Sequence, residues 1–261
     1  MILNSAIIAL LTGSLLVSGF MVYASGVGLQ IIRFWDLSSG SQYQLELERK
    51  TYLVSTILSY VLAFEIFSLF LFVYTAEHIH TQFVGAMCAA GSLNANNYGY
   101  PALTVKTFSV LACGIWLVVN YADNRSPAYP LIRIKYKFLL VILVALLLET
   151  VLNINYFRNL KTNIITSCCG TLFSEEAQTV AGGLASLPPV FSMVVFFISM
   201  ALLFRIGFHY LFTRKGALAF SMLSLWLFVF GLVCIVSFIS VYYYELPTHH
   251  CPFALLQKDY G

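Results

Sequence analysis

The chain has 261 residues, of which 60% are hydrophobic and only 10% are charged. A soluble domain typically contains about 25% charged residues. The composition therefore excludes an ordinary soluble protein and indicates a chain that is buried in a lipid bilayer. The formal net charge of +3 is too small to suggest binding to nucleic acid.

Six apolar segments are long enough to cross a membrane as helices, because one span takes roughly 20 residues. In chain order they are Ala6–Ile32, Thr51–Ala76, Ala102–Ala122, Lys137–Phe157, Pro188–Phe212 and Ala217–Tyr243. The first segment is too long for a signal peptide and Met1–Ser5 has no positive charge, so we expect it to be retained. The sequence predicts an all-α, polytopic membrane bundle of about six transmembrane helices, with residues 1–261 forming a single transmembrane domain.

Lysine and arginine gather on one side of this predicted topology. Ten of them lie in or beside the loops that follow the first, third and fifth helices, and four lie on the opposite side. The ten are Arg33, Arg49, Lys50, Arg125, Arg133, Lys135, Lys137, Arg205, Arg214 and Lys215, and the four are Lys106, Arg158, Lys161 and Lys258. Because basic loops stay in the cytoplasm, we expect both termini and a small cap to be extracytoplasmic, in a bacterial inner membrane or a plasma membrane.

Four cysteines fall in the predicted extracytoplasmic segments, namely Cys88, Cys168, Cys169 and Cys251. These compartments are oxidising, so the plainest interpretation is two structural disulfides. The vicinal pair Cys168 and Cys169 also suits thiol–disulfide exchange with Cys251 or Cys88 through a mixed disulfide. Paired cysteines above a small helical bundle are similar in general layout to quinone-linked disulfide-forming membrane enzymes such as the vitamin K epoxide reductase family. The resemblance is one of layout and assigns no residue.

The histidines suggest a soft-metal or haem site as a second interpretation. His249 and His250 precede Cys251, and His80 lies on the same predicted side. Thiolates and imidazoles suit copper, zinc or mercury, and two histidines from neighbouring helices suit haem. The vicinal cysteines also resemble those of bacterial mercury-uptake proteins. If the second helix continued through His80 to Cys88, these two residues would lie about 11 Å apart and could not share one ion.

Two acidic residues lie inside predicted spans, Glu65 in the second and Glu149 in the fourth. Counted from the cytoplasmic ends of their helices, they lie about 21 and 18 Å deep. A carboxyl group at this depth is costly and marks a functional site, such as a proton path or a contact to a quinone head group. We therefore expect the two helices to face each other or a shared cavity. The plainer alternative is a neutral carboxyl that is hydrogen-bonded to Tyr60 or Asn153.

Three functions remain open on these grounds. They are extracytoplasmic thiol redox chemistry linked to quinone, proton-coupled transport of a soft metal, and a non-catalytic subunit of a larger membrane complex. The expected partners are the lipid bilayer and either an extracytoplasmic redox protein or other membrane subunits. No P-loop, GxSxG, HExxH or dinucleotide fingerprint occurs, so we expect no use of ATP. Cys113 and Cys234 lie within predicted helices and should pack as small apolar side chains.

Overall fold

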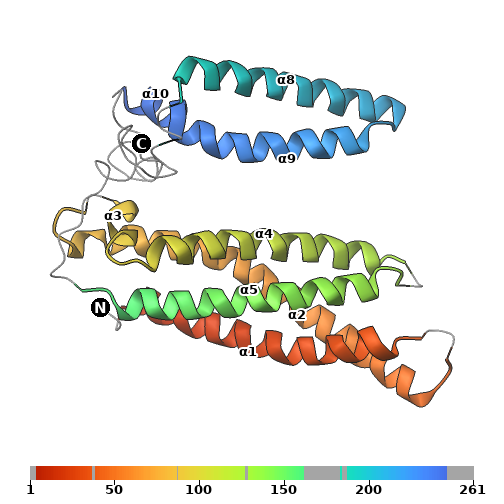
Figure 1. Cartoon of the computed structure of the whole chain (residues 1–261). Helices are drawn as coiled ribbons and strands as arrows, with labels where there is room; N and C mark the ends of the chain where they lie inside the picture. Colours follow the sequence, from red (N-terminus) through yellow and green to blue (C-terminus); the bar gives the residue numbers. More distant parts are fainter. Residues whose placement is uncertain are drawn as a thin grey trace. The chain divides into compact units, whose positions relative to one another are not determined.

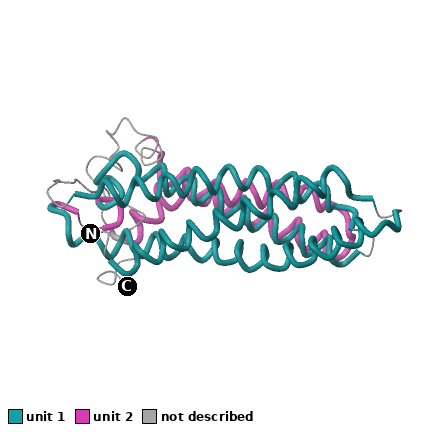
Figure 2. The backbone as a smooth tube through the Cα atoms, turned by 90° about the horizontal axis from the view of Figure 1, so that it is seen from below, with its two compact units in different colours: residues 1–84, 92–164 teal, residues 85–91, 165–261 magenta. Residues whose placement is uncertain are grey.

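The computed structural model describes residues 4–36, 39–86, 88–126, 129–161, 183 and 187–245. Every regular element in these ranges is a helix, and six helical segments are long and apolar enough to cross a membrane. To this extent the prediction of an all-helical chain with about six spans is confirmed. The fold divides into two compact units, residues 1–84 with 92–164 and residues 85–91 with 165–261 (Figure 2).

The first unit is an up-and-down bundle of four helices: α1 (Ser5–Phe34), α2 (Gln42–His78), α4 (Gly99–Asp123) and α5 (Ile132–Arg158) (Figure 1). Helices α1 and α4 each pack against both α2 and α5. The connections that follow α1 and α4 lie at the same end of this bundle (Figure 1). We call this end, where α1 and α4 end, the turn end, and the opposite end, where they begin, the N-terminal end.

Helix α2 begins nine residues before the predicted span at Thr51. The Ser41 hydroxyl caps its start and accepts a hydrogen bond from the backbone N–H of Gln44 at 3.3 Å. The first turns, Gln42–Lys50, are polar and need not enter the hydrocarbon, so a search for apolar runs finds the span but not the whole helix. The other five spans begin within five residues of their predicted starts.

Small residues allow the helices of the bundle to approach closely. A Cβ atom added to Gly28 of α1 would lie 3.0 Å from the ring of Tyr136 on α5. A Cβ atom on Gly13 would lie 2.9 Å from the ring of Phe64 on α2. Such close approach is the usual means by which membrane helices gain packing contacts. Apolar side chains of all four helices fill the core between them.

Helix α2 ends at His78, and a single 3₁₀ turn, η1 (His80–Gln82), follows it. Phe83 is then extended, with φ −111° and ψ 134°. The second helix therefore does not continue to Cys88, and His80 and Cys88 do not share a helical face. A short helix, α3 (Ala89–Leu93), precedes α4.

Tyr156 on α5 holds the segment before α4 against the N-terminal end of the bundle. Its hydroxyl donates to the Ser92 carbonyl oxygen at 3.1 Å, and its own carbonyl oxygen accepts from Asn96 Nδ2 at 3.0 Å. Gly99, the first residue of α4, lies so close to the Leu93 carbonyl oxygen that an added Cβ would be 2.2 Å from it. Only a residue without a side chain fits this position.

The second unit contains a helical hairpin of α8 (Pro189–Thr213) and α9 (Ala217–Cys234). The last span continues through a π turn, η2 (Ile235–Ile239), into α10 (Ser240–Tyr244). Arg214 and Gly216 form the hairpin turn with positive φ angles of 56° and 95°. Most side chains of α8 and α9 are exposed and apolar, as expected of surfaces that face lipid.

Candidate functional site

Three charged side chains meet inside the four-helix bundle. Lys106 of α4 places its Nζ atom 2.7 Å from Glu65 Oε1 of α2 and 2.6 Å from Glu149 Oε1 of α5. None of the three residues is more than 2% exposed. We call this group the central triad. It confirms the prediction that the helices of Glu65 and Glu149 face a shared interior.

The alternative in which these acids bond to Tyr60 or Asn153 is wrong. Tyr60 is 74% exposed and points away from the core, and neither amide atom of Asn153 has a partner among the described residues. The sequence analysis placed Lys106 among the basic residues of the extracytoplasmic side, although it falls within the predicted third span. It is fully buried and marks no membrane surface.

The spacing of polar residues along α4 was a signal that could have located Lys106. Its buried face includes the polar residues Lys106, Ser109, Asn120 and Asp123, separated by three, eleven and three residues, and eleven residues make about three helical turns. Residues three or four apart share one face of a helix, so these positions form one polar stripe on an otherwise apolar span. A lysine in such a stripe faces the interior of the bundle rather than the membrane surface.

The charges of the central triad do not balance if every group is ionised. One ammonium faces two carboxyls, so the group is neutral only when one carboxyl carries a proton. An uncompensated charge in the bilayer core is costly. Ser68 Oγ donates to Glu65 Oε1 at 2.8 Å, whereas Glu149 Oε2 has no partner within the described part of the chain. The two acids therefore differ in their hydrogen bonds, and Glu149 Oε2 is still able to form one.

A second buried ion pair lies toward the turn end. Lys135 Nζ of α5 is 2.8 Å from Asp123 Oδ2 and 3.0 Å from Asn120 Oδ1, both on α4. Asp123 Oδ1 also accepts a hydrogen bond from the Leu131 backbone N–H at 2.9 Å. Lys135 and Asp123, the turn-end pair, are 1% and 0% exposed. Lys135 was predicted in or beside the loop that follows the third helix and lies in the first turn of α5, but its burial was not predicted, and Asp123 was not singled out.

An apolar layer separates the central triad from the turn-end pair. Lys106 and Asn120 are fourteen positions apart along α4, a rise of about 21 Å. Apart from Ser109, the buried side chains of α4 between them belong to the hydrophobic core, as do those that pack against them. They include Leu58, Leu62, Cys113, Trp116, Leu139, Ile142 and Leu146. The bundle thus has two charged layers at different depths with apolar packing between them.

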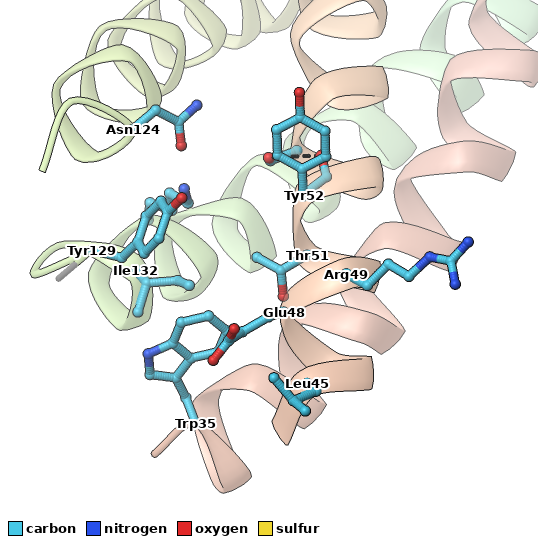
Figure 3. Close-up of a pocket in the computed structure, with 11 residues that line it drawn as sticks. Trp35, Leu45, Glu48, Arg49, Thr51, Tyr52, Asn124, Tyr129 and Ile132 are labelled. Carbon is cyan, nitrogen blue, oxygen red and sulfur yellow. Dashed lines mark hydrogen bonds between the residues drawn. The ribbon is translucent and has the colours of Figure 1, made fainter. Parts of the chain in front are cut away.

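A cavity of about 450 Å³ opens at the turn end beside Lys135 (Figure 3). Its walls come from the end of α1, the first turns of α2, the connection between α4 and α5, and the start of α5. The side chains that line it are Trp35, Leu45, Glu48, Arg49, Thr51, Tyr52, Ser55, Asn124, Tyr129, Ile132 and Lys135. The turn-end pair therefore lies next to a space that a small molecule can occupy, and no cavity was predicted here.

Most of the predicted cysteine and histidine site cannot be placed. Its members outside the described residues are Cys168, Cys169, Cys251, His249 and His250. Cys88 is buried, and His80 Nδ1 lies 3.6 Å from Glu77 Oε1. Among the described residues, no group of three or more His, Cys, Asp or Glu side chains is arranged to hold a metal ion. Thiol redox chemistry, soft-metal or haem binding and the convergence of these segments therefore stay predictions.

Cys113 and Cys234 are both fully buried, which confirms their predicted packing as small apolar side chains.

No family model, curated protein or solved structure matches the chain significantly. The functional argument therefore depends on the charged groups of the first unit.

Proposed function

We propose that the protein conducts protons across the membrane and that the central triad is the site where they bind. The observation that carries this proposal is the hydrogen bonding of one buried ammonium, Lys106, to two buried carboxyls. A carboxyl group that alternates between neutral and charged forms is the usual proton carrier within a membrane. Lys106 compensates the charge of one carboxylate, so the second carboxyl can hold the proton.

The excess of carboxyls over ammonium groups favours this function over a purely structural role. A buried ion pair that only joins helices needs one carboxylate for each ammonium, because every further buried charge adds a desolvation cost. The turn-end pair has this simpler composition, with one lysine and one aspartate. The central triad has an additional carboxyl whose Oε2 atom lacks a partner among the described residues.

Buried polar groups on α5 support a route from the N-terminal end of the bundle to the triad. Glu149, Asn153 and Tyr156 are spaced four and three residues apart, so they lie along one face of α5. All three are at most 2% exposed, and the Tyr156 hydroxyl reaches Ser92. Within the described residues, Asn153 and the Ser92 hydroxyl are unpartnered. Ordered water commonly bridges such groups and would complete a hydrogen-bonded path for protons from this end to the triad. Conduction across the whole membrane then requires a transient opening of the apolar layer between the triad and the turn end.

Proton flux into liposomes tests the proposal. The purified protein is reconstituted with a pH-sensitive dye inside, and a potassium diffusion potential drives protons inward. We expect the wild-type protein to acidify the lumen and Glu149→Gln to slow this by about 100-fold, the lower range for loss of a positioned proton-transfer group. Glutamine preserves the acceptor for Lys106 and leaves Glu65 to balance its charge, so this variant should fold.

The matched control is Glu46→Gln, which removes an exposed carboxyl from the first turns of α2. This variant should conduct like the wild-type protein. Wild-type liposomes that acidify no faster than empty ones would contradict proton conduction. Equal rates for Glu149→Gln and the wild-type protein would contradict the role of the triad.

We also infer that the turn end of the first unit faces the cytoplasm. With the buried lysines of the triad and the turn-end pair set aside, six exposed basic residues lie at or near the turn end, and two lie at the N-terminal end. The six are Arg33, Arg49, Lys50, Arg125, Arg133 and Lys137, and the two are Arg158 and Lys161. This bias supports cytoplasmic connections after α1 and α4, with both termini and the predicted cap outside.

Cysteine labelling in intact cells tests this orientation. Lys161→Cys should react with a membrane-impermeant maleimide added outside, whereas Gly40→Cys should react only after permeabilisation. Both positions are exposed, and an added Cβ at Gly40 meets no atom within 4 Å. Mass spectrometry of the labelled peptides separates these sites from the native cysteines. Labelling of Gly40→Cys in intact cells, with Lys161→Cys protected, would reverse the orientation.

A further inference from the structure

The cavity at the turn end combines apolar and aromatic walls with three charged residues, Glu48, Arg49 and Lys135. Trp35 and Tyr129 form one side and contact each other edge to face, with ring centroids 6.4 Å apart. Figure 3 shows the Glu48 carboxylate beside the Trp35 ring and the Arg49 side chain directed away from both aromatic rings. Gln44 Nε2 donates to Glu48 Oε1 at 3.0 Å, which leaves the second carboxylate oxygen for another donor.

Lys135 supplies a buried donor at this cavity. Its ammonium group has three N–H bonds. One is donated to Asn120 Oδ1 at 3.0 Å, and Asp123 Oδ2 lies 2.8 Å away as the ion-pair partner. The side chain is only 1% exposed, yet it lines the cavity. The ammonium group thus has donor capacity beyond its bond to Asn120 for an acceptor atom of a molecule in the cavity, and a hydrogen bond to a charged donor is strong.

We propose that this cavity binds the head group of a membrane-soluble quinone. In this arrangement the flat ring lies beside Trp35 and Tyr129, and one carbonyl oxygen accepts a hydrogen bond from the Lys135 ammonium group. A cavity of about 450 Å³ lies within the range of ordinary small-molecule sites. Phosphate-bearing ligands fit less well, because they favour arginine clusters and the Arg49 side chain lies away from the aromatic rings (Figure 3).

Calorimetric titration of detergent-solubilised protein with decylubiquinone tests this site independently of proton flux. We expect saturable binding to the wild-type protein. The double variant Asp123→Asn/Lys135→Met removes the donor and its countercharge together, which avoids an unpaired buried charge. It should bind about tenfold more weakly, as expected for loss of a hydrogen bond to a charged group.

A second variant tests the cavity without touching the ion pair. Leu45 is 61% exposed and lines the cavity, whereas Leu53 is 52% exposed on the same helix and does not. Leu45→Trp should fill the cavity and weaken binding at least as much as the double variant does, and Leu53→Trp should leave the affinity unchanged.

Decylubiquinone should also quench part of the tryptophan fluorescence of the wild-type protein. Trp35→Phe should abolish this quenched part.

Three results would overturn the proposal. One is a heat signal that does not saturate, which indicates simple partition into micelles. Another is equal affinity in the wild-type, Leu45→Trp and double-variant proteins. The third is equal binding of decanol, which has the tail but no carbonyl groups, since this would make the cavity an unselective apolar site.

Discussion

Replacement of Lys106 by methionine is expected to lower the free energy of unfolding by about 3–5 kcal/mol, the usual loss when one partner of a buried ion pair is removed. Methionine has a similar length but no charge, so Glu65 and Glu149 would face each other without their common countercharge. Unfolding by denaturant in detergent micelles, followed by circular dichroism, measures the change. Lys137→Met, which removes an exposed lysine from α5, is the matched control and should change stability little.

Removal of the excess negative charge should reverse this loss. The triple variant Lys106→Met/Glu65→Gln/Glu149→Gln has no charge in the triad and should recover most of the wild-type stability while conducting no protons. A Lys106→Met protein that unfolds at the wild-type denaturant concentration would contradict the ionic role of the triad.

Asp123→Asn is expected to destabilise the protein by about 1.5–3 kcal/mol, the range for hydrogen bonds to charged groups. The amide can still accept from the Leu131 N–H, so the connection between α4 and α5 keeps this bond. The buried ammonium of Lys135, however, loses its countercharge. The effect should be smaller than that of Lys106→Met, because Lys135 lines a cavity and water can reach its surroundings.

A double-mutant cycle with Lys135→Met measures how strongly these two residues are coupled. The double variant Asp123→Asn/Lys135→Met should be more stable than either single variant, with a coupling energy of about 0.5–3 kcal/mol. Additive losses in the cycle would show that the two side chains act independently and would contradict the ion pair.

The spans and the meeting of two acids could be predicted because each depends on one simple rule. Apolar length located the six helices, and equal depth in the bilayer brought Glu65 and Glu149 together. The rule that assigns basic residues to membrane surfaces misled the sequence analysis at Lys106 and did not indicate the burial of Lys135. Both lie within helices, and only the pairing of α4 with α2 and α5 provides the carboxylates that make their burial possible.

Other features depend on tertiary packing that one sequence does not display. Asp123 lies just beyond the predicted span that ends at Ala122, where an acidic residue usually faces water, and only the return of α5 encloses it. The cavity at the turn end is formed by segments that are far apart in the chain, such as Trp35 and Tyr129. No local sequence pattern indicates that these segments lie together in the fold.

The apolar layer between the two charged layers has an electrical consequence. It occupies about 21 Å along α4, roughly two-thirds of the ~30 Å hydrocarbon core. A similar share of any transmembrane voltage falls across it, since few mobile ions or polar groups screen the field there. A full crossing of the membrane changes the energy of a unit charge by about 2.3 kcal/mol per 100 mV. In the proposed function, transfer of one proton between the two layers would therefore take or release roughly 1.5 kcal/mol per 100 mV, and the membrane potential would bias which layer holds the proton.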